Sequence, residues 1–182
     1  MSRFLSPKVI ETLYLYYVRP MLEYASPLWA AAITQEDSLM LERLQASVAR
    51  SILRADWRTP KTTLFKTLDW PSLKFRREVQ CVKLFRRLVC LKSDLLVSCL
   101  PEVFRKSSEG YKFRKSHVIP LPYAKSKQMS KSFFLHAVVL WNSLPTSVAS
   151  APSTSAFDHA LMAHWSTHKH DLNPDLPNVL PL

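Results

Sequence analysis

Glycine is almost absent from the sequence: Gly110 is the only one, and thirteen prolines stand beside it. Glycine supplies the positive φ of tight hairpins and the bare backbone that surrounds bound phosphate. Glycine-rich nucleotide loops are therefore excluded, and helices separated by prolines are the favoured architecture. We predict an all-α fold with a minor extended element at residues 112–124.

Patterns for metal binding or catalysis are missing as well. The cysteines, Cys81, Cys90 and Cys99, lie nine residues apart, whereas a zinc site needs closely spaced pairs. We expect reduced core cysteines in an intracellular protein of the nucleus or the cytoplasm. Adjacent carboxylates occur at Glu36 and Asp37, where helix capping explains them better than a metal does. Because phosphate loops and nucleophile elbows are missing too, we predict no catalytic residue, no metal ligand and no cofactor.

Two features near the ends of the sequence have an ordinary interpretation. His159, His164, His168 and His170 could include a metal pair, but zinc needs further ligands, so exposed or partly packed side chains are preferred. The first five residues lack the apolar core of a secretion signal, and apolar stretches stay far below the roughly 20 residues of a membrane span. We predict neither a signal nor an anchor.

Positive charge is concentrated in the middle of the chain. The net charge is +11, and residues 61–131 hold seventeen Lys and Arg against five Asp and Glu. The residues before and after this segment are close to neutral. Such a segment is typical of a protein that binds a polyanion, most often nucleic acid. The alternative is a solvated surface without a partner.

Caps and apolar periodicity predict helices in the first 70 residues. Ser6 and Pro7 begin one that Pro20 should end or kink near Val18, with a second piece running towards Trp29. Thr34 caps a helix and Thr59 with Pro60 opens a short one. The apolar stripe predicted for the helix after Thr34 contains Leu41, Leu44, Val48 and Ile52.

A basic helix is predicted to begin at Pro71 and Ser72. Its predicted packing side consists of Phe75, Val79, Val82, Phe85 and Val89. The cations expected around the rest of its circumference are Lys74, Arg76, Arg77, Lys83, Arg86 and Arg87. Guanidinium groups bind phosphate in bidentate fashion, so the four arginines are the first candidates for phosphate contact. The alternative is a solvated helix face.

Residues 105–131 are expected to form a basic loop with short extended pieces. Its candidate nucleic-acid ligands are Arg105, Lys106, Lys112, Arg114 and Lys115. Tyr111, Phe113 and Tyr123 could stack on bases, as aromatic residues among cations do in single-strand binders. They could equally anchor the loop to the core.

The remaining helices complete a division into four regions. Ser130 should cap a helix that contains Trp141 as a core anchor and stops at Pro145, and Ser153 should begin a last helix through Trp165. We expect a helical region at 1–100, a basic loop region at 101–131, helices at 132–167 and an irregular tail at 168–182.

The helix at residues 10–18 is apolar nearly all round, which is usual for a helix enclosed on several sides. We expect part of it, including Tyr14 and Leu15, to lie open. Exposed apolar surface of this kind drives association, so self-association or a partner is expected.

Four segments carry a resemblance to a known family. Residues 18–29 resemble the RP-x-LEYAS-x-xW block that follows the palm in reverse transcriptases of non-LTR retrotransposons (LINE elements) of the Jockey-like kind. Residues 41–52 resemble the family's LE-x-x-Q-x-x-x-x-R-x-I helix, residues 68–77 its LGWPSL-x-x-RR block, and residues 133–145 its SF-and-LWNSLP block. Ser153 and Phe157 match its closing S-x-x-x-F. Asp69 departs from the pattern, because the family usually has glycine there.

The resemblance implies the thumb and the region after it, from the C-terminal end of an RNA-directed DNA polymerase. In the family, the aspartates that perform DNA synthesis lie upstream in the palm, so no catalytic residue is carried over. The expected role is binding of template–primer or element RNA, with an upstream palm and fingers polypeptide as a possible partner. A frame that starts at Met1 implies a truncated or host-captured fragment. A translated relic without selected activity and a host-adopted protein-interaction adaptor stay open, as does the choice among RNA, DNA and hybrid.

Overall fold

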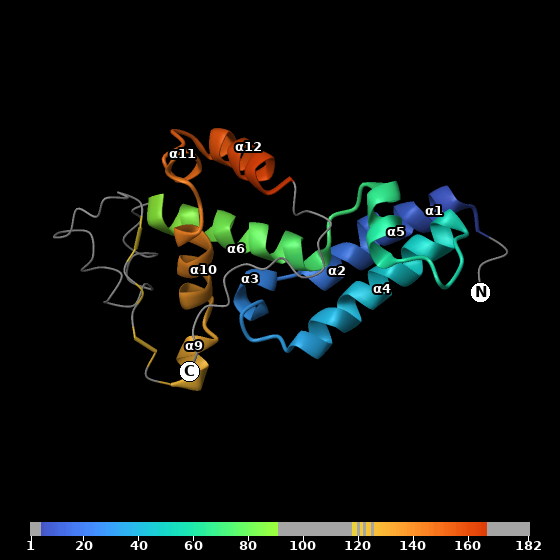
Figure 1. Ribbon diagram of the computed structural model, residues 1–182, viewed down its shortest axis with the longest axis horizontal. Coiled ribbons are helices and arrows are strands. Elements are labelled where there is room, and N and C mark those ends of the chain that lie inside the picture. Colours follow the sequence, from blue (N-terminus) through green and yellow to red (C-terminus); the bar gives the residue numbers. More distant parts are fainter. Residues whose placement is uncertain (1–4, 91–117, 120, 122, 125, 167–182) are drawn as a thin grey trace. The chain divides into compact units, whose positions relative to one another are not determined.

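The computed structural model describes residues 5–90, 118, 119, 121, 123, 124 and 126–166 (Figure 1). The all-α prediction is confirmed, because these residues form helices, turns and coil. The extended element predicted at residues 112–124 lies partly outside them. Those of its residues that are described form no strand, so that part of the prediction is wrong for them. At Ile119 the backbone N–H and C=O pair with the side-chain amide of Asn142 (2.9 and 2.8 Å) rather than with a neighbouring strand.

The chain divides into two compact units. Among the described residues, unit 1 contains 5–26 and 33–77, and unit 2 contains 27–32, 78–90 and those from 118 to 166. The division falls inside the long helix α6 (Leu73–Cys90). The boundary predicted near residue 100 and the tail predicted at 168–182 lie outside the described residues.

The first helix of unit 1 continues past Pro20, which was expected to end or kink it near Val18, and its geometry changes just before that proline. α1 (Pro7–Leu13), the π-helical turn η1 (Tyr14–Val18) and α2 (Arg19–Glu23) follow one another directly. As predicted, the Ser6 side chain caps α1. In a regular α-helix the Pro20 ring would meet the carbonyl group four residues earlier, and the wider π turn relieves such crowding. The chain therefore changes its helical pitch before Pro20, and the helix ends at Glu23 instead.

Three helix ends need a left-handed residue, and none of them has glycine. Ala25 (φ 49°) separates α2 from α3 (Ser26–Trp29), while Arg54 (φ 50°) and Asp69 (φ 53°) end the next two helices. Glycine is the usual residue in this conformation, because a Cβ atom crowds the backbone there. Asp69 occupies the position at which the resembling family has glycine, so the turn before Trp70 keeps the geometry that glycine favours.

The helix predicted after Thr34 is confirmed, but its buried face is not the predicted stripe. α4 (Gln35–Leu53) begins where the Thr34 hydroxyl accepts a hydrogen bond from the N–H of Asp37 (3.1 Å). Leu44, predicted to pack, is 40% exposed. The buried residues of α4 are Glu42, Gln45, Ala46, Ala49 and Ile52. Two of these side chains are polar: Gln45 accepts a hydrogen bond from the Tyr14 hydroxyl, and Glu42 accepts one from the backbone N–H of Lys74.

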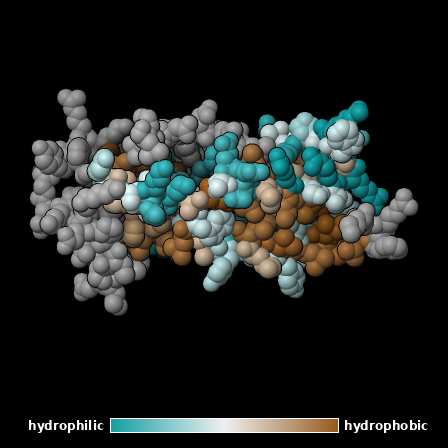
Figure 2. Space-filling model, turned by 90° about the horizontal axis from the view of Figure 1, so that it is seen from below, coloured by the Kyte–Doolittle hydropathy of each residue, from teal (hydrophilic) through white to brown (hydrophobic). Residues whose placement is uncertain are grey.

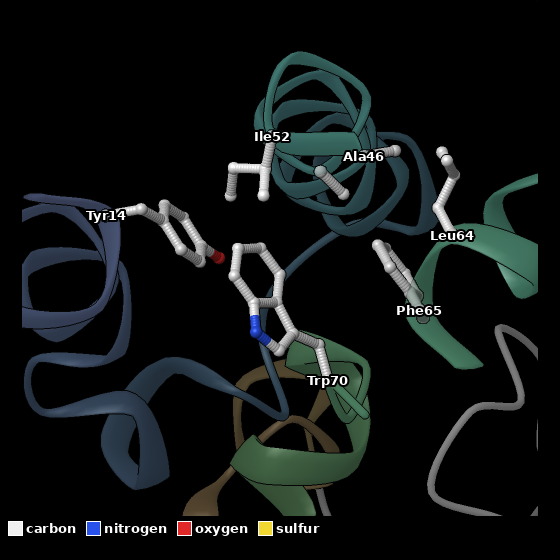
Figure 3. Packing of buried hydrophobic residues seen from close by; sticks show 7 residues of the cluster. Tyr14, Ala46, Ile52, Leu64, Phe65 and Trp70 are labelled. Atoms are coloured by element: carbon white, nitrogen blue, oxygen red, sulfur yellow. The ribbon is translucent and has the colours of Figure 1, made fainter. Parts of the chain in front are cut away.

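The core of unit 1 forms where α4, α5 (Lys61–Leu68) and the first helix meet (Figure 3). Its seven buried members are Tyr14, Ala46, Ala49, Ile52, Leu64, Phe65 and Trp70. Tyr14 stacks on Trp70 with ring centroids 4.8 Å apart. The expectation that Tyr14 lies open is therefore wrong: the residue is 2% exposed and its hydroxyl donates to Gln45 Oε1 (2.9 Å). Leu15 is partly buried against the same core.

The first helix also has an exposed apolar surface. Its exposed large hydrophobic residues are Val9, Leu13, Tyr16, Tyr17, Val18, Met21 and Tyr24. Figure 2 shows hydrophobic surface gathered over the part of the molecule that contains α1, α2 and α4. The prediction that part of this helix lacks cover is confirmed for these residues, although Tyr14 is not among them.

Unit 2 contains the second part of α6, the short helices α9 (Lys127–Ser130) and α11 (Thr146–Ala149), α10 (Phe133–Asn142) and α12 (Thr154–Trp165). Ser153 caps α12 as predicted, whereas Ser130 is the last residue of α9 rather than a cap, and α10 begins after Ser132. Trp141 is 5% exposed and lies between Phe157 and Phe85, with ring centroids 5.9 and 5.8 Å away. Its predicted place in the core is confirmed.

Candidate nucleic-acid interface

The cations of α6 were expected to face outward, and most of them do not. Arg77 and Arg86 are 3% and 7% exposed, and Arg87 is exposed. Lys74, Arg76 and Lys83 are half-buried. The predicted division into one packing side and one solvated basic side is wrong in its extent, because buried residues occupy most of the circumference of the helix from Leu73 to Arg86. The less buried stripe contains Arg76, Gln80, Lys83 and Arg87, and of these only Arg87 is exposed. Arg77 in unit 1 and Arg86 in unit 2, both predicted to contact phosphate, are therefore buried.

Arg76 forms an ion pair inside unit 1. Its guanidinium group donates to both carboxylate oxygens of Glu23, with Nη2 2.9 Å from Oε2. The hydrogen bond to Glu23 raises the pKa of Arg76 above its ordinary value. This fork-to-carboxylate geometry joins the end of α2 to the start of α6.

Two partly buried polar contacts join α4 to the beginning of α6. Arg77 Nη2 donates to the hydroxyl of Ser38 (2.7 Å), and the backbone N–H of Lys74 donates to Glu42 Oε1 (2.8 Å). Burial raises the pKa of Glu42 above its ordinary value of 4.5, and the hydrogen bond from Lys74 and the charge of Arg77 oppose that shift. Both side chains therefore serve the internal structure of unit 1.

Arg86 binds the backbone at the start of α12 in unit 2. Its Nη2 atom donates to the carbonyl oxygens of Ala151 (2.7 Å) and Ser153 (3.1 Å), and its Cζ atom lies 4.2 Å from the centroid of the Phe157 ring. One turn earlier, Lys83 pairs with Asp158 on α12 (3.1 Å). An arginine with two carbonyl acceptors and a ring beneath it is a structural residue. Of the six predicted cations on α6, Arg87 is the one that is exposed.

The other predicted ligands form the basic loop. Arg105, Lys106, Lys112, Arg114 and Lys115 lie outside the described residues, as do the stacking candidates Tyr111 and Phe113. Tyr123 is described and is 86% exposed, which is compatible with a stacking surface and not with an anchor in the core.

Sequence reasoning missed a second basic site, at the corner between α4 and α5. We call the segment 50–61 the α4–α5 corner; it holds Arg50, Arg54, Arg58 and Lys61 against one acid, Asp56. Trp57, at its tip, is 75% exposed. The net charge of the first 60 residues is close to zero, so it gives no sign of the local excess of cations in the corner. A tryptophan between the turn-forming residues Asp56 and Pro60 was the signal that could have found it.

Two of the four histidines that were considered as a possible metal pair lie in the described part of the chain. His159 and His164 are exposed on α12, and His168 and His170 lie outside the described residues. Within the described part of the chain, no three His, Cys, Asp or Glu side chains are grouped as a metal site would require. Cys81 is buried with its Sγ 3.9 Å from the carbonyl oxygen of Pro27, which fits a core cysteine.

None of the helices formed by residues 5–90 and 126–166 combines the length and the apolar character that crossing a bilayer requires.

Comparison with known proteins leaves the family unassigned. No family model matches the chain, and neither a curated protein nor a solved structure matches it.

Proposed function

We propose that this chain is a non-catalytic, thumb-like C-terminal fragment of a retrotransposon RNA-directed DNA polymerase, which binds template–primer or element RNA through a basic surface. The observation that carries the proposal is the concentration of seventeen cations against five acids in residues 61–131, in a chain with four ordered segments that resemble this region. Charge of this density attracts phosphate backbones irrespective of base sequence.

Contacts made by residues of the resembling segments support the proposal. Glu23, in the first segment, pairs with Arg76 in the third. Gln45, in the second segment, accepts from the Tyr14 hydroxyl and donates to the carbonyl oxygen of Pro71 in the third (2.9 Å). Asn142, in the fourth, binds the backbone of Ile119. Residues that stand at the motif positions thus hold the helices together, which is a physical reason for such motifs to recur in this order.

Several cations of α6 have partners within the chain, so the proposed binding surface contains fewer residues than the sequence predicted. Arg76, Arg77 and Arg86 are committed to acceptors within the chain, and Lys83 is paired with Asp158. The proposal therefore assigns phosphate contact to Arg87 and to Arg105, Lys106, Lys112, Arg114 and Lys115.

Salt dependence of binding tests this assignment. The affinity for a mixed-sequence oligonucleotide should fall with salt, with a log–log slope of about −0.7 to −0.9 per phosphate contact. Replacing Arg87 and the five loop cations with alanine should flatten the slope, whereas the exposed Lys8→Ala on α1 is the control and should leave it unchanged. The chain alone should extend no primer with any divalent metal. An unchanged slope in the multiple variant would refute the assignment, and templated extension would refute the non-catalytic role.

A second candidate function is a protein-interaction adaptor. The exposed apolar side of the first helix, which includes Tyr16, Tyr17, Met21 and Tyr24, favours a protein contact there. Its partner would be an upstream palm polypeptide or a second copy of the chain. Sedimentation velocity tests whether the partner is a second copy of the chain. A monomer that persists at high concentration would contradict self-association.

A further inference from the structure

The α4–α5 corner presents a tryptophan to solvent. Trp57 is 75% exposed, whereas Trp70, Trp141 and Trp165 are 5–7% exposed. A single exposed apolar residue is common on protein surfaces, so exposure alone assigns no role. Trp57 differs in two respects: hydrogen bonds hold the turn that carries it, and an arginine side chain lies over its ring.

The backbone that carries Trp57 is held in a turn. Asp56 Oδ1 accepts from the N–H of Arg58 (2.8 Å), and the carbonyl oxygen of Asp56 accepts from the N–H of Thr59 (3.0 Å). Arg50 Nη2 donates to the carbonyl oxygen of Thr59 (3.3 Å), which ties the turn to α4. A ring on a fixed turn loses little freedom when a partner covers it.

A guanidinium group lies over the ring, and the segment that carries the ring is basic. Arg58 Cζ lies 5.1 Å from the centroid of the Trp57 ring, a cation–π distance, and Arg54 is also exposed. The nearby acid, Asp56, already accepts from a backbone N–H. An exposed aromatic ring with a guanidinium group beside it, on a basic segment, matches one ligand chemistry closely, that of a base next to its phosphate. A duplex offers no free base face, so the matching form is single-stranded.

We propose that the α4–α5 corner is a stacking site for an unpaired base of single-stranded nucleic acid, with Trp57 as the platform and with Arg54 and Arg58 as contacts to the adjacent phosphates. This rests on the proposed function, but it places a contact in unit 1, at residues that precede the basic segment 61–131.

Binding of two fluorescent oligomers by anisotropy tests the site. One is oligothymidylate of about 16 nucleotides and the other is an abasic oligomer of equal length, which keeps the phosphates and lacks the bases. Trp57→Ala should lower the affinity for oligothymidylate about 10-fold and leave that for the abasic oligomer unchanged. Trp57→Phe should retain most of the affinity, whereas Trp57→Leu should behave as the alanine variant does, because stacking needs a ring.

The matched control is Tyr16→Ala, which removes a ring of similar exposure (73%) from η1 and should change neither affinity. If the wild-type chain binds neither oligomer, the proposed function and the site fail together. If it binds both and Trp57→Ala binds equally well, the site alone is refuted. Equal losses for the two oligomers also overturn it, because the ring is then not reading a base. A change in the sedimentation of the Trp57→Ala chain without nucleic acid would show a protein contact and would likewise overturn it.

Discussion

In unit 1 the interior contains polar side chains with specific partners: Gln45 bridges the Tyr14 hydroxyl and the carbonyl oxygen of Pro71, and Glu42 accepts from the backbone of Lys74. In unit 2 the interior centres on three rings, those of Phe85, Trp141 and Phe157. Hydrogen bonds constrain direction, whereas packed rings constrain volume. Different kinds of substitution should therefore destabilise the two units.

Removing the central ring of unit 2 should have the largest effect. Trp141→Ala leaves a cavity between Phe85 and Phe157, and we expect it to lower the free energy of unfolding by about 3–5 kcal/mol. Urea unfolding followed by circular dichroism measures the loss. Trp57→Ala is the matched control, because an exposed tryptophan should cost about 0.5 kcal/mol or less. Equal losses would mean that Trp141 is not a packing centre.

Removing the bridging amide of unit 1 should have a smaller but still clear effect. Gln45→Ala leaves the Tyr14 hydroxyl and the carbonyl oxygen of Pro71 without their partner, and we expect a loss of about 2–3 kcal/mol in the same urea unfolding measurement. Gln35→Ala, at the exposed start of the same helix, is the control for the loss of a glutamine. A loss no greater than that of the control would show that the polar contacts do not hold unit 1 together.

The smallest effect concerns pH. Because burial raises the pKa of Glu42, the folded chain binds its proton more tightly than the unfolded chain does. The contribution of Glu42 is therefore most favourable below its ordinary pKa of 4.5 and is lost as the pH rises through the raised value. Glu42→Gln keeps an oxygen for the Lys74 N–H and cannot ionise.

Stability measured between about pH 4 and pH 7 should accordingly decline less in Glu42→Gln than in the wild-type chain. Glu36→Gln, exposed in the first turn of α4, serves as the control. A steeper decline in Glu42→Gln would contradict the raised pKa.

Helix starts could be predicted from the sequence because their causes are local. Ser6, Thr34 and Ser153 each accept a hydrogen bond from an N–H three residues later, so the signal lies within one turn. The short helices α9 and α11 were missed, because four residues are too few to show a periodicity.

Helix faces could not be predicted equally well, because their causes are distant in sequence. Glu42 and Gln45 are polar and were left out of the predicted packing stripe, yet their partners lie 26–32 residues away. Arg86 was assigned to phosphate, and its acceptors are the carbonyl groups of Ala151 and Ser153, 65 and 67 residues further on. Hydropathy along one helix contains no information about such acceptors.

The π-helical turn at Tyr14–Val18 bears on the tolerance of this helix to changes in length. A π turn closes its hydrogen bond over one residue more than an α turn does. The first helix can therefore be regarded as an α-helix with a single inserted residue. Deleting Tyr16 or Tyr17 would remove the inserted residue and keep the preceding face in register, at the cost of the crowding at Pro20 that the π turn relieves. Deleting a residue elsewhere would rotate the preceding face by about 100° relative to Pro20 and the residues after it. Such a rotation would break the stacking of Tyr14 on Trp70 and its hydrogen bond to Gln45. The core contacts of Tyr14 therefore depend on where along the helix a residue is removed.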